Sequence, residues 1–191
     1  MKYAKFLPIV LAAFVMACGS SNKSLQKVDT GDIPPWYLNP PVDPAFVYAT
    51  SSATSQDMQM AINKAEQDCR AEIARQVDSK VSALTKKFDE EVGGKDAQLL
   101  TSFTSASKTV ASTSLSGAKT KQRDVKKDGD MFRAYVLMEY NVAQAMVSQL
   151  KQEEQLYTRF RATQTYKELE DEANKVDAAK QQQQQPAQAP Q

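Results

Sequence analysis

The stretch AINKAEQDCRAEIARQV, residues 61–77, indicates the fold class of this 191-residue chain. Its apolar residues recur at steps of three and four positions, as they do along one face of an α-helix, and charged residues occupy the other faces. The period continues in both directions and predicts one amphipathic helix over residues 56–90, with Thr54 or Ser55 as its N-cap. The predicted buried face consists of Met58, Ala61, Ile62, Ala65, Cys69, Ile73, Val77, Val81, Leu84 and Phe88.

Segments with strand character lie on both sides of this helix. Before it, FVYAT, residues 46–50, is rich in aromatic and β-branched residues and predicts a short strand. After it, residues 131–140 have the same character. They follow an Asp128-Gly129 pair, which suits a two-residue hairpin turn. The other strand of this hairpin is a polar segment predicted over residues 113–126.

The turn also predicts the register of the hairpin. With Asp128 and Gly129 as the turn, Asp124 faces Arg133 and Val125 faces Phe132. A register shifted by two residues would place Lys126 opposite Arg133, and like charges directly opposite each other disfavour that pairing. We therefore expect the first register.

Two further helices complete the predicted fold. One spans residues 96–110, and the other spans residues 142–176 after the hairpin. The second half of the latter is mostly charged and is expected to project from the domain or to pair with a partner helix. The sequence thus predicts an α+β fold, with a small β-α-β-β core, the long amphipathic helix on the sheet and a C-terminal helix. The inner side of the helix over residues 142–176 is predicted to consist of Val142, Met146, Leu150, Tyr157 and Phe160.

The first residues have the layout of an export signal. Lys2 and Lys5 precede an apolar run from Phe6 to Met16, which is too short to span a bilayer. The run leads into Val15-Met16-Ala17-Cys18, which resembles the lipobox of bacterial lipoproteins, with Met16 in place of the usual small residue. An ordinary secretory signal with a chance cysteine is the alternative.

The lipobox resemblance implies a lipid anchor on Cys18. The signal would be cleaved between Ala17 and Cys18, and Cys18 would carry an S-diacylglycerol and an N-acyl chain such as palmitate. Gly19, rather than an aspartate, follows the cysteine, which resembles the sorting signal of lipoproteins that are sent to the cell outer membrane. The side of that membrane that the protein faces is left open.

The chain divides into four segments on this reading. Residues 1–17 are the signal peptide, and residues 18–33 are a polar, flexible tether. Residues 34–176 form the α+β domain with its C-terminal helical extension. Residues 177–191 are rich in Gln, Pro and Ala and are expected to be disordered.

The composition excludes several classes of function. The chain contains no histidine, so histidine-based acid–base catalysis and most zinc sites are excluded. Without Lys2 and Lys5 of the signal, 22 basic and 23 acidic side chains remain, which gives no indication of nucleic-acid binding. If Cys18 is lipidated, Cys69 is the only free thiol. Its place on the apolar face favours a buried, inert thiol over a reactive one.

Two surface features are candidates for partner contact. Trp36 lies in the proline-rich arm PPWYLNPP, residues 34–41, which is expected to be extended. Trp36 either packs onto the domain, binds a partner or rests at the membrane surface. Lys119, Lys121 and Arg123 alternate along one face of the polar strand. They either protect an edge strand from unwanted pairing or contact a neighbouring subunit.

The order of these elements resembles the LPP-type family of bacterial outer-membrane lipoproteins, of about twenty kilodaltons, which includes a flagellar lipoprotein. The likeness covers residues 34–145 and rests on Pro35-Trp36, residues 47–50, residues 61–77 and the Asp128-Gly129 hairpin. Ser51-Ser52-Ala53 stands where relatives often have glycines. The resemblance implies a small α+β domain and a non-enzymatic envelope role, in some relatives within oligomeric assemblies near the flagellar base.

A structural or assembly lipoprotein of the bacterial envelope is the leading hypothesis for function. Its partners would be membrane lipid through Cys18 and either envelope proteins or further copies of the chain. The alternative is a recognition module that binds peptidoglycan or a host ligand. No metal, cofactor or small-molecule substrate is expected. Without histidine, an enzyme would need catalytic carboxylate pairs, a lysine or Cys69. The acidic clusters are more typical of a solvated helix surface.

Overall fold

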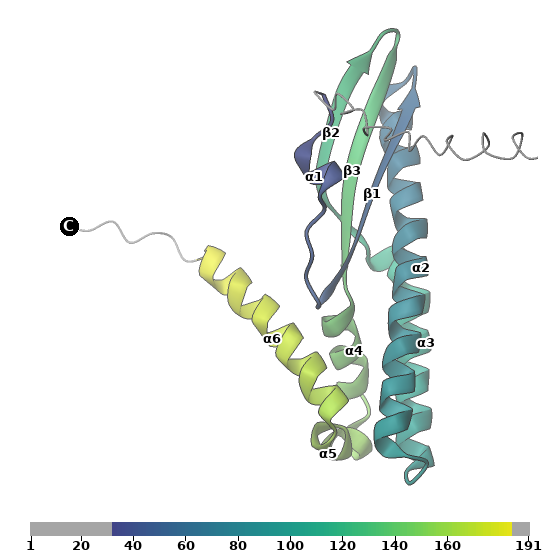
Figure 1. The fold of residues 1–191 in the computed structure, drawn as a ribbon, viewed down its shortest axis with the longest axis vertical. Coiled ribbons are helices and arrows are strands. Elements are labelled where there is room, and N and C mark those ends of the chain that lie inside the picture. The colour runs from purple at the N-terminus through teal and green to yellow at the C-terminus, as the bar shows by residue number, and fades with distance from the viewer. Residues whose placement is uncertain (1–31, 185–191) are drawn as a thin grey trace, which may run out of the picture. The chain divides into compact units, whose positions relative to one another are not determined.

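The computed structural model of the chain describes residues 32–184 and confirms the α+β class. Two helices, α2 and α3, separate the first strand from the hairpin, and three helices follow it (Figure 1). In chain order the elements are α1 (Pro35–Leu38), β1 (Phe46–Ser55), α2 (Met58–Val92), α3 (Ala97–Gly117), β2 (Lys119–Asp128), β3 (Met131–Asn141), α4 (Val142–Lys151), α5 (Glu154–Ala162) and α6 (Gln164–Gln184).

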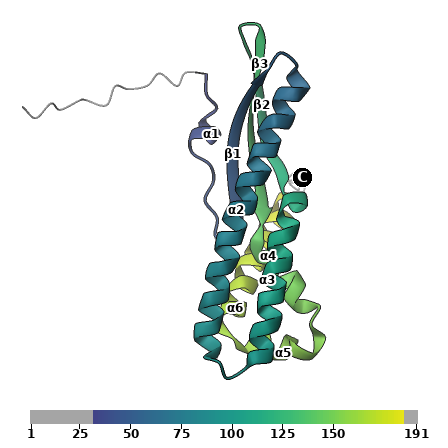
Figure 2. The ribbon, with the colours of Figure 1, turned by 90° about the vertical axis from the view of Figure 1, so that its right-hand side faces the viewer.

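The sheet is antiparallel, with the strand order β1-β3-β2. Because side chains alternate along a strand, each strand has an inner face toward α2 and an outer face away from it. The inner face of β3 joins Val47 and Ala49 of β1 in the core beneath α2, and α3 packs alongside α2 (Figure 2). The inner residues of β3 are Ala134, Val136, Met138 and Tyr140.

The long helix confirms the amphipathic pattern and differs from the prediction at its start. Asp57, and not Thr54 or Ser55, is the N-cap, and its carboxylate accepts a hydrogen bond from the Met60 amide at 2.7 Å. Thr54 and Ser55 lie in β1, which is five residues longer than predicted. Met58, predicted to be buried, is the first residue of the helix and is 48% exposed.

The predicted polar strand begins too early, since residues 113–117 belong to α3. This helix buries Leu99, Phe103 and Val110 against its neighbours. Its serine and threonine hydroxyls donate to carbonyls three or four residues earlier, for example Thr113 to Thr109 at 2.9 Å. Those residues have modest helix propensity, so the packing of the apolar stripe outweighs their local preference.

The predicted hairpin register is wrong by two residues. Asp128 pairs with Met131, so Gly129 and Asp130 form the turn, and Lys126 lies opposite Arg133. A shift of two leaves every side chain on the same face, and the apolar pattern therefore cannot separate the two registers. Asp124 lies 3.8 Å from the Lys126 ammonium on the same strand, which offsets the like-charge pair. Gly129 has a φ of 60°, the conformation that the turn requires.

The predicted C-terminal helix is three helices. The chain turns after Lys151 and again at Thr163, and α6 then packs against α4 through a buried stripe. Of the two predicted alternatives, the second half therefore pairs with a helix, and that helix belongs to its own chain. Helix α6 also continues to Gln184, so residues 177–184 are helical rather than part of a disordered tail. The stripe consists of Tyr166, Leu169, Ala173 and Val176.

Glu91, at the end of α2, caps the start of α6. Its carboxylate accepts hydrogen bonds from the backbone amides of Gln164 and Thr165, and from the Thr165 hydroxyl at 2.7 Å. Lys87, one turn earlier on α2, forms an ion pair with Glu168. Partial burial raises the pKa of Glu91, but the hydrogen bonds from Thr165 and Gln164 outweigh it and hold that pKa below its usual value.

We expect Glu91→Gln to lower the free energy of unfolding by about 1 kcal/mol at pH 7, as for other lost helix caps. Since the pKa is lower in the folded state, this contribution is present above the unfolded pKa of about 4.3 and is lost as the pH falls through the folded pKa. Urea unfolding at pH 7 and pH 3 checks this, with the exposed neighbour Glu90→Gln as control. An equal difference from wild type at both pH values would contradict the charged cap.

Candidate functional site: a groove between α6 and the sheet

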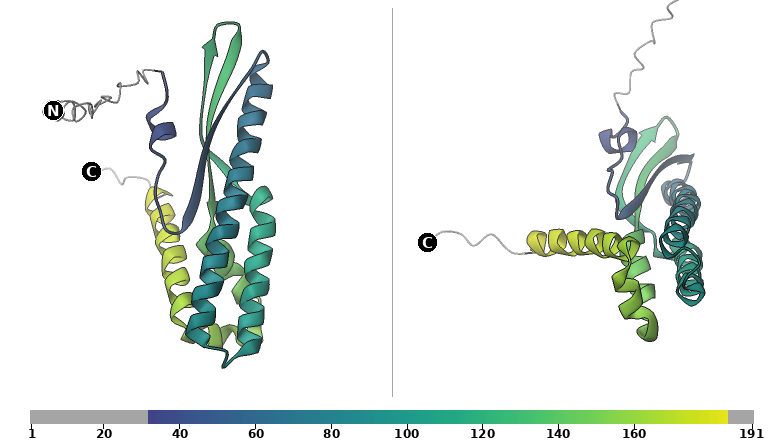
Figure 3. Two further views of the ribbon diagram at one scale, coloured as in Figure 1. Left: turned by 45° about the vertical axis from the view of Figure 1, so that its right-hand side comes forward. Right: turned by 60° about the horizontal axis from the view of Figure 1, so that its bottom comes forward.

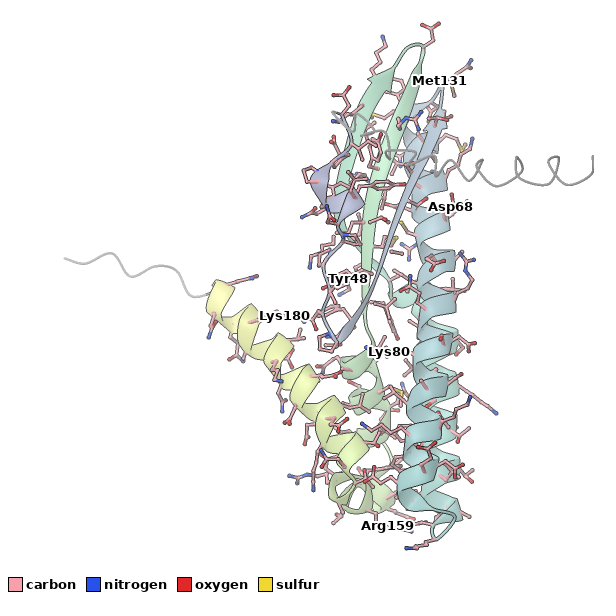
Figure 4. The ribbon with its side chains drawn as sticks, in the orientation of Figure 1. Tyr48, Asp68, Lys80, Met131, Arg159 and Lys180 are labelled. Atoms are coloured by element: carbon pink, nitrogen blue, oxygen red, sulfur yellow. The ribbon has the colours of Figure 1, made fainter. Side chains whose placement is uncertain are left out.

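A groove of about 620 Å³ separates α6 from the outer face of the sheet. In the views of Figures 1 and 3, α6 diverges from the strands toward its C-terminal end. Tyr48 and Lys180 mark the two sides of the groove (Figure 4). The sheet contributes Phe46, Tyr48, Lys121 and Glu139, the preceding loop Val42, Asp43 and Pro44, and α6 Glu172, Lys175, Val176, Ala179, Lys180 and Gln183.

The floor of the groove is aromatic and carries an ion pair. Phe46 and Tyr48, two residues apart on β1, stack with ring centroids 5.6 Å apart. The Lys121 ammonium lies 5.4 Å from the Tyr48 centroid and 2.7 Å from a Glu139 carboxylate oxygen. Burial lowers the pKa of Lys121, but Glu139 outweighs it and raises that pKa above its usual value. Lys121 therefore stays charged, as a cation–π contact requires.

The α6 wall presents charges of both signs. Glu172, Lys175 and Lys180 lie on the helix face that lines the groove, on either side of the apolar Val176 and Ala179. These positions follow helical spacing, so they share one face. Because β1, β2, β3, the loop and α6 all contribute to the lining, the groove is a product of the tertiary fold.

Lys80 of α2 supports the loop at the rim. Its ammonium donates to the Pro44 carbonyl. Burial lowers its pKa, and the nearby charges of Glu172 and Asp43 partly counter that effect. Lys80 thus ties the loop at one rim of the groove to α2, and Glu91 ties the start of α6, which precedes the groove-lining residues, to the same helix.

The three cations predicted to share one face of the polar strand do not do so. A β-bulge between Thr120 and Gln122 inserts one extra residue, which reverses the alternation of side chains beyond it. Lys119 lies opposite Glu139, and Lys121 reaches the same outer face. Arg123 instead approaches Glu66 of α2, at 3.8 Å. Of the three, Lys121 alone lines the groove.

The proline-rich arm is not fully extended, because residues 35–38 form one helical turn, α1. Pro35 suits the first position of that turn. Trp36 is half-buried, and its ring centroid lies 6.4 Å from that of Tyr37. Tyr37 packs on Tyr135 of the outer sheet face, with ring centroids 5.1 Å apart. Its hydroxyl donates a hydrogen bond to the Ser52 hydroxyl at 3.4 Å. Tyr37 is thus the main anchor of the arm, and partner binding by Trp36 stays a prediction.

Cys69 is buried, as the sequence indicated. Its thiol lies 3.5 Å from the carbonyl oxygens of Ala49 and Val136, and burial raises its pKa to about 12. Such a thiol is almost entirely protonated at neutral pH and is a poor nucleophile.

Within residues 32–184, no group of three or more His, Cys, Asp or Glu side chains could hold a metal ion. None of the helices in that range is long and apolar enough to cross a bilayer. The predicted lipidation and cleavage residues, Cys18 and Ala17, lie outside the described residues, as does the predicted tether up to residue 31.

Comparisons with protein-family models, with curated proteins and with solved structures found no match for this chain.

The aromatic floor has a signal in the sequence, since Phe46 and Tyr48 alternate with the core residues Val47 and Ala49 and must face away from the helix. Glu139 and the α6 residues have no comparable signal, because the placement of α6 depends on the turns that precede it.

Proposed function

We propose that the chain is a lipid-anchored structural or assembly lipoprotein of the bacterial outer membrane, related to the LPP type, that acts through protein–protein contacts at the groove. The groove is the observation that carries this proposal. Its floor offers two stacked aromatic rings, and its walls offer fixed charges of both signs. Protein interfaces combine aromatic contacts at their centre with a polar rim in this way.

The anchor and the domain have separate tasks in this proposal. The acyl chains on Cys18 hold the protein at the membrane, and the tether lets the domain reach its partners. The domain presents a groove in which Lys80 holds the loop at one rim and Glu91 holds the start of α6, so less ordering is needed on binding. A role without catalysis is part of this proposal.

A photo-crosslinking residue in the groove tests the proposal in intact cells. With the crosslinker in place of Ala179, on the α6 wall, we expect covalent adducts to one or a few envelope proteins, or to a second copy of the chain. Asn174 lies on the same helix, is exposed and does not line the groove, so it is the matched control. Equal adducts from both positions, or none from Ala179, would contradict docking at the groove. Adducts to peptidoglycan alone would favour the recognition module.

A further inference from the structure

Beyond Phe46, whose backbone N–H donates to the Asp43 carbonyl, strand β1 has an edge with no strand beside it in the described part of the chain. The strand order β1-β3-β2 leaves it with β3 as its one neighbour among residues 32–184, and all ten of its residues pair with β3 in unbroken register. In Figure 2, α2 crosses in front of part of β1, and no other strand of the described residues lies between β1 and the viewer. Every second residue of an edge strand directs its N–H and C=O outward, so β1 offers a row of backbone donors and acceptors.

The two edges of the sheet differ in how well they are protected. Edge strands of monomeric proteins usually carry charges, prolines or bulges that prevent pairing with other chains. Strand β2 has Lys, Arg or Asp at most positions and a bulge after Thr120. Strand β1, FVYATSSATS, has no charge, no proline and no register shift. One edge is therefore protected and the other is open to pairing.

We propose that β1 pairs in antiparallel fashion with β1 of a second copy of this chain, so that two sheets join into one of six strands. This inference rests on the proposed assembly function and names its partner. Pairing of β2 with its own copy would bring lysines and arginines together, whereas β1 brings no charge to the junction. An antiparallel pair of identical strands is related by a two-fold axis and closes as a dimer.

The two halves of β1 are complementary in size across such a junction. The outward-facing residues of its first half are Phe46 and Tyr48, and those of its second half are Ser52 and Thr54. Pairing centred on Thr50 places Phe46 opposite Thr54 and Tyr48 opposite Ser52 of the other copy. Aromatic residues pair well with small or β-branched ones across antiparallel strands. The aromatic floor of the groove would then continue across the junction.

Single cysteines on β1 of the full lipidated chain in its membrane test this pairing. Cys69 is buried and Cys18 would be lipidated, so an introduced thiol is the reactive one. We expect Thr50→Cys to form disulfide-linked homodimers under mild oxidation, because Thr50 faces its own copy across the two-fold axis and therefore lies within disulfide range. Gln122→Cys, exposed on the outer face of β2, is the matched control and should stay monomeric.

A second variant separates the junction from the fold. Thr54→Glu puts a charge on the β1 edge, but it faces Arg133 within the same chain, so folding should be retained by thermal melting. Combined with Thr50→Cys, it should reduce the linked dimer about tenfold, equivalent to about 1.4 kcal/mol. Dimers formed only between Thr50→Cys and Gln122→Cys copies, or no linked dimers at all, would overturn β1–β1 pairing. In either case, envelope adducts from Ala179 would leave the assembly function standing.

Discussion

Replacing Cys18 with serine is expected to abolish lipidation completely and to block cleavage before residue 18. If Cys18 is the lipid attachment site, the mature wild-type protein begins at this residue and carries two or three acyl chains. Each buried methylene contributes about 0.8 kcal/mol to membrane binding, and two chains are enough for stable attachment. Intact mass of the membrane-extracted protein measures the start residue and the acyl increment in one experiment.

The second cysteine supplies the control for this prediction. Cys69→Ser should keep both the acyl mass and the processed start, because that thiol is buried within the core. If the mature wild-type protein carried no added lipid, the proposed attachment to the outer membrane would be contradicted, and so would the proposed relation to outer-membrane lipoproteins. The groove and the β1 edge would then belong to a secreted protein.

Phe103→Ala is expected to cost about 3–5 kcal/mol of unfolding free energy, a large share of the 5–15 kcal/mol typical of a domain. Phe103 of α3 stacks on Phe88 of α2 with centroids 4.1 Å apart, and Phe160 of α5 lies 6.1 Å from Phe88. All three side chains are fully buried. This cluster joins three helices at the end away from the hairpin, and no neighbouring element can fill the cavity without moving a helix.

Urea unfolding followed by circular dichroism measures the loss for Phe103→Ala. Phe46→Ala is the matched control, since the same side chain is removed from a half-buried position on the groove floor. We expect its cost to be about 1 kcal/mol, because less apolar area leaves contact with protein. If both variants lost the same amount, the three-phenylalanine cluster would not be a main support of the fold.

Several parts of the fold follow from local pattern alone. The period of residues 61–77 and the alternation at residues 46–50 each reflect one buried face, and a buried face leaves a direct record in the sequence. The same reasoning placed Cys69 in the core and made the α+β class predictable. The floor aromatics, Phe46 and Tyr48, could be assigned to the outer face on the same ground.

Other parts of the fold could not be predicted from the sequence, because alternative arrangements bury the same residues. A two-residue shift of the hairpin keeps every face unchanged, so the sequence could not exclude Lys126 opposite Arg133. The bulge after Thr120 separates Arg123 from Lys121 and depends on how β2 fits against β3 and α2. The serine- and threonine-rich end of α3 is helical through packing rather than propensity.

The amino-acid sequence alone predicted the class of fold, the long helix and its buried stripe, and it indicates a candidate lipid anchor, because each depends on residues that are close together in the chain. Tertiary structure alone decided the hairpin register, the division of the C-terminal helix into three and the direction of α6. The groove depends on that direction, which is set by the Glu91 cap and by the contacts of α6 with α4. These contacts join residues far apart in the chain, and no local pattern records them.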